Sequence, residues 1–149
     1  MTYLPFLKSQ KLLSIATQDK GKPWIATVYF GVDEKGILYF VSQKDAKHSL
    51  HITKRPEIAF SLAWCDQKNP NNRKGIQGLG ICTMARGPKQ ILVALSAIHK
   101  KIPEFKKTIT LEWIRKNAWG SKIWIIKPSY IKYWDDELYG DEESKEFNV

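Results

Sequence analysis

The sequence has few cysteines, and their spacing is not that of a metal site or a disulfide scaffold. Cys65 and Cys82 are the only two, and they form no Cys-x-x-Cys pair. Isolated cysteines of this kind favour free thiols in a reducing compartment. His48 and His51 lie three residues apart, but no carboxylate or cysteine follows at a matching spacing. The pattern therefore predicts no metal site.

Other signatures are also absent. No apolar run reaches about 18 residues, the length that a membrane-spanning helix needs. The first residues lack the basic and apolar regions of a secretory signal. No Gly-x-Ser-x-Gly elbow and no Walker motif occurs, which argues against α/β-hydrolase and P-loop chemistry. We therefore expect a cytoplasmic protein without a membrane partner.

Acidic residues are scarce outside one segment. The chain of 149 residues carries 24 Lys and Arg against 15 Asp and Glu, a formal net charge of +9. Seven of the acids fall within residues 135–149 beside a single base, so residues 1–134 hold 23 bases and 8 acids. A body of this charge attracts nucleic acid or a phosphorylated cofactor. We expect one domain over residues 1–134 and an acidic, mobile tail over residues 135–149.

Strand patterns dominate the rest of the sequence. Apolar runs rich in β-branched and aromatic residues, bounded by turn residues, predict strands over Leu12–Thr17, Trp24–Val32, Ile37–Val41, Ile58–Leu62, Gly75–Arg86, Lys122–Lys127 and Tyr130–Trp134. Helical spacing predicts helices over Tyr3–Gln10, residues 47–55, Pro88–Lys101 and Thr110–Asn117. The first three strands follow one another through short turns, which predicts an antiparallel meander. About seven strands in so short a chain favour a closed barrel.

A basic helix follows directly on a predicted strand within residues 36–62. A helix start presents free backbone N–H groups and the positive end of the helix dipole, and together these attract an anion. Ser42 ends the strand, and Lys47 and His48 lie in the first turns of the helix. These three residues could complete a cradle for a phosphate. Alternatively, Ser42 caps the helix and the basic residues form a solvated face.

The strand Trp24–Val32 is largely apolar on both faces. One face fills the barrel in this interpretation. The other face carries Ile25, Thr27 and Tyr29, and it needs either a planar ligand or a second subunit to cover it.

At this point the sequence resembles a known family, the flavin-binding split-barrel proteins related to pyridoxamine 5′-phosphate oxidase. The most specific match is the run 28–42, followed by Lys47-His48 and Arg55-Pro56. Weaker matches lie at Ile76–Gly80 and at residues 127–133, and the whole resemblance extends from Leu12 to Trp134. It implies a mainly β fold with peripheral helices, an antiparallel split barrel of the FMN-binding type. It also implies a homodimer with flavin at the subunit interface.

The resemblance further implies which residues contact the cofactor. The flavin ring would lie near Thr27, Val28, Tyr29 and Gln77. The ribityl chain and phosphate would lie near Phe40, Val41, Ser42, Lys47 and His48. Two basic residues of the oxidase are replaced here by Ile25 and Phe30, and the oxidase's C-terminal segment has no counterpart, so oxidation of vitamin B6 phosphates is not expected.

Three functions remain open from the sequence. The first is an FMN-dependent oxidoreductase, in which the flavin supplies the redox chemistry and no residue stands out as a catalytic acid or base. Members of the family also bind haem or deazaflavin, so these are alternative cofactors. The second is a basic barrel that binds single-stranded nucleic acid. The third is a dimer without turnover that acts as a stress-related or regulatory binding protein.

Overall fold

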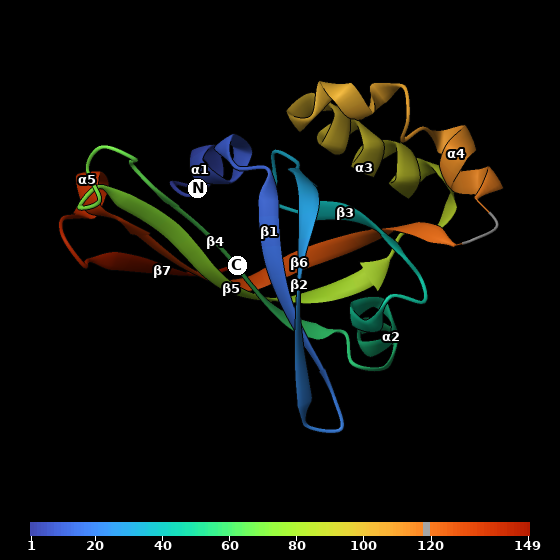
Figure 1. The fold of residues 1–149 in the computed structure, drawn as a ribbon, viewed down its shortest axis with the longest axis horizontal. Coiled ribbons are helices and arrows are strands. Elements are labelled where there is room, and N and C mark those ends of the chain that lie inside the picture. The colour runs from blue at the N-terminus through green and yellow to red at the C-terminus, as the bar shows by residue number, and fades with distance from the viewer. Residues whose placement is uncertain (118–119) are drawn as a thin grey trace.

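The computed structural model describes residues 1–117 and 120–149 (Figure 1). Its strands are β1 (Leu12–Asp19), β2 (Lys22–Val32), β3 (Leu38–Gln43), β4 (Glu57–Cys65), β5 (Arg73–Met84), β6 (Ser121–Asp135) and β7 (Ser144–Asn148). Its helices are α1 (Leu4–Ser9), α2 (Lys47–Lys54), α3 (Gly87–Lys101), the 3-10 helix η1 (Pro103–Lys106), α4 (Leu111–Lys116) and α5 (Asp136–Tyr139). Within these described ranges, no helix combines the length and the apolar character that a membrane crossing requires.

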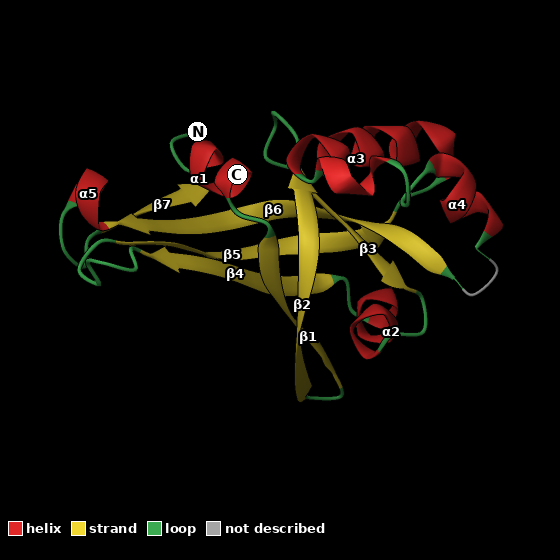
Figure 2. Ribbon diagram, turned by 45° about the horizontal axis from the view of Figure 1, so that its top comes forward, coloured by secondary structure: helices red, strands yellow, loops and turns green. Residues whose placement is uncertain are grey.

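Six of the strands close into an antiparallel barrel. The hydrogen-bonded order is β3-β2-β1-β4-β5-β6, and β3 pairs with β6 to complete the ring. β7 adds to β6 outside the ring. Helices α1, α3 and α4 lie on one side of the barrel, and α2 lies near its other end (Figures 1 and 2). The predicted mainly β fold with peripheral helices is therefore confirmed.

The barrel is split between β2 and β3. β2 pairs with β1 from Lys22 to Tyr29, but it pairs with β3 only over Phe30–Val32. Within the described residues, Lys22–Tyr29 of β2 do not pair with β3. Helix α2 contacts both β1 and β2. The split thus exposes one edge of β2 beside a basic helix.

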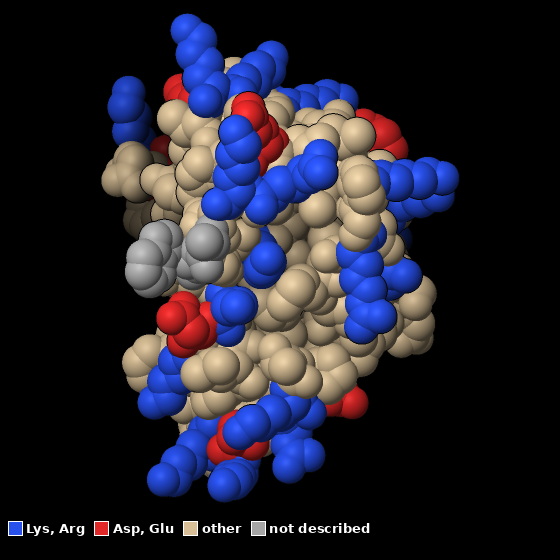
Figure 3. Space-filling model, turned by 90° about the vertical axis from the view of Figure 1, so that its right-hand side faces the viewer, with Lys and Arg blue, Asp and Glu red and all other residues tan. Residues whose placement is uncertain are grey.

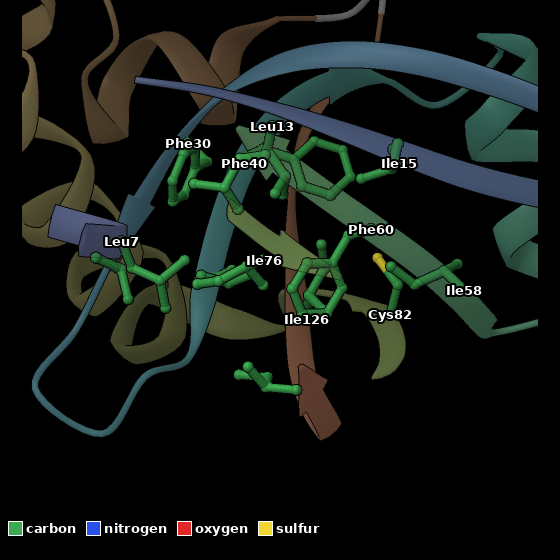
Figure 4. Close-up of a cluster of buried hydrophobic side chains, with 14 of the residues drawn as sticks. Leu7, Leu13, Ile15, Phe30, Phe40, Ile58, Phe60, Ile76, Cys82 and Ile126 are labelled. Carbon is green, nitrogen blue, oxygen red and sulfur yellow. The ribbon is translucent and has the colours of Figure 1, made fainter. Parts of the chain in front are cut away.

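The barrel is filled by apolar side chains from every closing strand (Figure 4). Phe30 from β2, Phe40 from β3 and Ile126 from β6 are fully buried in this cluster. A second cluster lies under α3, which packs directly against β2 at Gly31. A Cβ atom at Gly31 would lie 2.5 Å from the backbone nitrogen of Ile98. Only glycine therefore lets this helix approach the strand so closely.

The last two predicted strands form one continuous strand, β6. We expected Pro128 to separate them, because proline cannot donate a ladder hydrogen bond. In the structure Pro128 lies opposite Gly80, where the β5–β6 register shifts between Leu79 and Gly80. This irregularity accommodates the proline without ending the strand.

The acidic segment also differs from the prediction. We expected a mobile tail over residues 135–149, whereas the structure places α5 and β7 there. Asp135 caps α5 by accepting hydrogen bonds from the backbone N–H groups of Glu137 and Leu138. Phe147 on β7 packs edge-to-face on Tyr3, with ring centroids 5.1 Å apart. A few apolar anchors and a strand partner therefore outweigh the high charge of this segment.

Candidate functional site

Helix α2 is held in the split by two buried histidines. His48 Nε2 lies 2.6 Å from Ser42 Oγ on β3, and His51 Nδ1 lies 3.0 Å from Thr17 Oγ1 on β1. Both imidazoles face the barrel because they lie three residues apart, on one side of the helix. These two hydrogen bonds fix the position of α2 relative to β1 and β3.

Burial determines how His48 can act. Desolvation, followed by the nearby His51, lowers the pKa of His48 below its usual value. The neutral imidazole is therefore favoured at neutral pH. A neutral His48 that donates from Nε2 to Ser42 Oγ leaves the Ser42 hydroxyl proton free to point at a ligand. In that tautomer, His48 orients the Ser42 hydroxyl and carries no charge for pairing with a ligand.

Three lysines lie on or next to the elements that meet at Ser42, here called the Ser42 corner. Lys122 on β6 is the direct cross-strand partner of Ser42. Lys44 follows on from β3, and its backbone N–H donates to the Gly120 carbonyl over 2.8 Å. Lys47 starts α2, and its Nζ lies 4.4 Å from the centre of the Trp24 ring. None of the three belongs to an ion pair within the part of the chain that the structure describes.

The start of α2 adds backbone donors to this corner. Ala46 precedes the helix in an extended conformation, and among the described residues no side chain caps it. The first N–H groups of a helix have no partner within the helix itself. They join the Ser42 hydroxyl and the three lysines, so the corner is suited to binding an anion.

The open edge of β2 leads away from this corner. The Phe30 N–H donates to the Lys11 carbonyl beside β1, over 3.1 Å. Because backbone groups alternate in direction along a strand, the N–H and C=O groups of Ile25, Thr27 and Tyr29 point away from β1. Within the described chain, β3 pairs with β2 only over Phe30–Val32, which follow these three residues in the sequence. This edge can therefore hydrogen-bond a planar ligand.

The outer face of the barrel carries the exposed side chains of the predicted ring site. Ile25 and Tyr29 are 66% and 55% exposed. Thr27 Oγ1 lies 3.3 Å from Ser14 Oγ on β1. The Tyr29 ring packs edge-to-face on Phe105 of η1, with centroids 5.5 Å apart. The outward-facing side chains of β2 are thus open to a ligand or to a second chain.

Gln77 lies on the same outer face but far from Thr27. The cross-strand row runs from Thr27 to Ser14, then to Ser61 on β4 and Gln77 on β5. Three strand spacings separate its ends by about 14 Å. A single flavin ring against Thr27 does not reach Gln77 in the same chain.

Three predicted site residues place their side chains toward the core. Phe40 is fully buried and stacks on Trp124, with ring centroids 6.5 Å apart. Val28 and Val41 are half-buried, and each packs against a core cluster. Any contact of Phe40 with a ligand would have to come from its backbone.

Sequence reasoning missed Lys122, Phe105 and the role of Trp24. Lys122 reaches the corner only through the pairing of β3 with β6, and no local motif signals that pairing. Phe105 lies in η1, directly after α3, and contacts Tyr29 because α3 packs on β2. Trp24 lies in a predicted strand, but its contact with Lys47 depends on the packing of α2. These are tertiary contacts, and no local sequence pattern predicts them.

Comparison with known proteins identifies the fold. Neither a protein-family model nor a curated protein sequence matches this chain. A haem-binding protein from Mycobacterium smegmatis matches in structure with a TM-score of 0.74 and 14% identity, over 95% of this chain and 54% of that one. A NimC/NimA family protein from Clostridium acetobutylicum gives 0.68 and 16%, over 99% and 90%. The chain has the split-barrel fold of proteins related to pyridoxamine 5′-phosphate oxidase.

A third split-barrel match is an FAD-binding protein from Mesorhizobium loti. Its TM-score is 0.67 at 11% identity, with 87% of each chain covered. This chain spans about half the length of the M. smegmatis protein. At these identities the likeness establishes the fold, and the function must be argued from the site.

Proposed function

We propose that this chain binds FMN along the open edge of β2, with the phosphate at the Ser42 corner. One observation carries the proposal: an unpaired strand edge leads directly to a corner with several anion-binding groups. A flavin has the matching shape, because its planar ring carries N–H and C=O groups and its ribityl chain ends in a phosphate. When bound, FMN supplies electron transfer, and the protein binds and orients it.

The phosphate contacts come from three elements in this proposal. Ser42 on β3 donates its hydroxyl proton, which His48 keeps directed outward. Lys122 on β6 and Lys47 on α2 supply positive charge, and the start of α2 supplies backbone N–H groups. Charge-assisted contacts of this kind are among the strongest hydrogen bonds in proteins. Lys122 thereby supplies a positive charge in a chain where Ile25 and Phe30 replace two basic residues of the oxidase.

The ring contacts come mainly from the backbone. Ile25, Thr27 and Tyr29 direct their backbone groups to the free edge of β2. Phe105 closes the Tyr29 end of this edge, and the Trp24–Lys47 pair closes the other end. An aromatic contact therefore lies at each end of this edge.

The histidines favour flavin over haem. The chain has three histidines, and each side chain is engaged away from the outer face. His48 is bonded to Ser42, His51 to Thr17, and His99 Nε2 lies 2.6 Å from the Ile109 carbonyl. An imidazole ligand for a haem iron on the outer face would require one of these contacts to break.

We further propose that the outer face forms a homodimer. A groove of about 380 Å³ crosses β1, β4 and β5, and exposed Ile25 and Leu79 border it. An apolar row, Ile25–Ala16–Ala59–Leu79–Tyr130, runs beside the polar row of Thr27 and Gln77. A two-fold axis would bring each apolar row against its copy. Gln77 of one chain could then approach the ring bound by the other.

The direct test is uptake of FMN by the purified protein. The proposal predicts a yellow protein that releases an oxidised-flavin spectrum on denaturation, or an apoprotein that takes up one FMN per chain in a titration. Sedimentation should give a dimer, and Leu79→Lys should give monomers. A colourless protein that takes up no FMN contradicts the proposal. If that protein bound oligonucleotides with a steep salt dependence, the nucleic-acid alternative would replace it.

A further inference from the structure

A hollow at the α5 end of the barrel is not used by the flavin proposal. Its volume is about 850 Å³, and it lies between α1, α5 and the ends of β4, β5 and β6 (Figure 1). Trp64 and Leu138 border it and remain 38% and 56% exposed. Phe6 and Tyr133 also line it, with their stacked rings 5.8 Å apart between centroids. A cavity of this size with aromatic walls is suited to the apolar part of a small organic molecule.

The charged groups of this hollow carry an excess of negative charge. Lys74 Nζ lies 3.8 Å from Asp135 Oδ2 and 3.6 Å from Glu137 Oε2. All three residues line the hollow, so two carboxylates face one ammonium group. Asp135 is buried and already accepts three hydrogen bonds within the protein. The Glu137 side chain is 62% exposed, and it is therefore the carboxylate that a ligand can reach.

Two groups of the hollow retain the capacity to accept hydrogen bonds. Gln10, at the end of α1, donates from Nε2 to Ser9 Oγ over 3.1 Å. Its carbonyl oxygen has no partner in the part of the chain that the structure describes. Glu137 accepts from Asn72 Nδ2 over 2.5 Å, and an ionised carboxylate has about four acceptor positions. Both Gln10 and Glu137 can therefore accept from the N–H groups of a ligand.

The Trp64 ring already lies beside a cation. Trp64 and Lys74 are direct cross-strand partners on β4 and β5, and Lys74 Nζ lies 5.7 Å from the centre of the Trp64 ring. The face of an aromatic ring attracts cations, and indole does so most strongly. Because the two carboxylates hold Lys74, part of the exposed ring stays open to a second group. The hollow thus combines an aromatic face with a carboxylate that a ligand can reach.

The charge of the whole molecule directs cations to this end. Residues 135–149, which include α5, hold seven acids and one base in a chain of net charge +9. Helices α2 and α4 lie at the opposite end (Figure 1), and that side shows mainly Lys and Arg around a hollowed, less charged centre (Figure 3). A cleft lined by one sign of charge raises the local concentration of ions of the opposite sign. The α5 end is therefore the part of this basic protein that attracts a cation.

We propose that this hollow binds a small organic cation, a primary ammonium group carried on an apolar ring or chain. The ammonium group donates to Glu137 and to the Gln10 carbonyl, and the apolar part packs on Trp64 and Leu138. One positive charge on the ligand balances the excess carboxylate. Charge-assisted hydrogen bonds and burial of the apolar part both contribute to the affinity. The inference does not rest on the proposed flavin function, because the lining of the hollow shares no residue with the open edge of β2 or with the Ser42 corner.

The test separates the charge of the ligand from its apolar part. Phenethylamine, hydrocinnamate and ethylamine are titrated into the full chain, and the indole N–H signal of Trp64 is followed by NMR. Hydrocinnamate carries a carboxylate in place of the ammonium group of phenethylamine, and ethylamine lacks the ring. Phenethylamine should shift the Trp64 signal and should bind at least about tenfold more tightly than either of the other two.

Two pairs of variants locate the site. Trp64→Ala and Glu137→Gln should each weaken the binding of phenethylamine by about tenfold, measured by calorimetry. Trp113→Ala and Glu112→Gln are the matched controls on α4, because Trp113 is 39% exposed and Glu112 pairs with a lysine as Glu137 does. The binding of phenethylamine by these controls should stay within about twofold of that by the unaltered protein.

Each result decides a different statement. If hydrocinnamate binds as tightly as phenethylamine, the carboxylates do not select the ligand, and the inference falls. It also falls if ethylamine binds equally well, because the ring then makes no contact. Equal losses in the α4 controls and in Trp64→Ala and Glu137→Gln would show that the hollow is not the site. A protein that takes up FMN but not phenethylamine overturns this inference alone. A protein that binds phenethylamine as described but takes up no FMN supports this inference and overturns the proposed function.

Discussion

Ser42 on β3 and Lys122 on β6 face one another as cross-strand partners, although they lie far apart in the sequence. This pairing closes the barrel and also places a cation beside the Ser42 hydroxyl. His48 approaches the same hydroxyl from α2, at 2.6 Å. The pairing that closes the barrel is therefore the same pairing that brings Lys122 to the Ser42 corner.

Lys122→Ala should weaken FMN binding by roughly 1.5–3 kcal/mol, the scale of a hydrogen bond to a charged group. This corresponds to about 10- to 100-fold in the dissociation constant, measured by quenching of flavin fluorescence. Lys127→Ala is the control, because Lys127 is exposed on the same strand. Equal affinities for the two variants would show that Lys122 acts only through net charge.

Lys47→Ala should reduce the affinity for FMN on the same scale, roughly 1.5–3 kcal/mol. Lys47 lies over the Trp24 ring, so the change removes a cation at the start of α2 without opening the core. Lys54→Ala, at the other end of the helix, is the matched control. An unchanged dissociation constant would show that Lys47 is only a surface charge and does not contact the FMN phosphate.

The stability of the protein should fall as the pH drops below about 6.5, the ordinary pKa of histidine. Burial lowers the pKa of His48 in the folded state, so the unfolded chain binds more protons in that range. Protonation then favours unfolding, and stability is restored as the pH rises. Urea denaturation between pH 5 and pH 8 measures this slope, and His48→Gln should make it shallower. The prediction fails if both proteins share one slope.

Lys101 should give a second pH dependence, on the alkaline side. Burial lowers the pKa of Lys101 to about 7, while its Nζ donates to the Leu7 carbonyl over 2.8 Å. Because the unfolded chain stays protonated to higher pH, stability should rise between about pH 7 and pH 10. Lys101→Met should remove this rise relative to the unaltered protein in urea denaturation. A parallel pH profile for Lys101→Met would show that the ammonium is not destabilised by burial.

Gly31→Ala should destabilise the protein by about 1–3 kcal/mol, the usual cost of overpacking. The added methyl group would press on the backbone of α3 near Ile98, and a helix backbone cannot rotate away as a side chain can. Chemical denaturation measures the loss. An unaltered midpoint would mean that α3 does not rest on β2 as closely as the structure shows.

Local patterns predicted most of the fold, because each barrel strand carries its own alternation. Phe30 and Phe40 are buried as the inward periodicity of their strands requires. The sequence did not predict β7, because this strand has little apolar content. Its Phe147 packs on Tyr3 from the other end of the chain, and this contact exists only in the folded protein. It also did not predict Lys122 at the corner or Phe105 on Tyr29, because both contacts join segments that are distant in the chain. The features that the sequence predicted least well are therefore contacts between distant segments, which form only through tertiary packing.

The central claim is that the Ser42 corner holds the phosphate of a flavin whose ring lies on β2. The most direct measurement compares the dissociation constants of FMN and riboflavin, which differ only by that phosphate, in the unaltered protein and in Lys122→Ala. The account predicts that FMN binds at least about tenfold more tightly than riboflavin, and that Lys122→Ala removes most of this difference. Equal binding of FMN and riboflavin, or binding of neither, would contradict it.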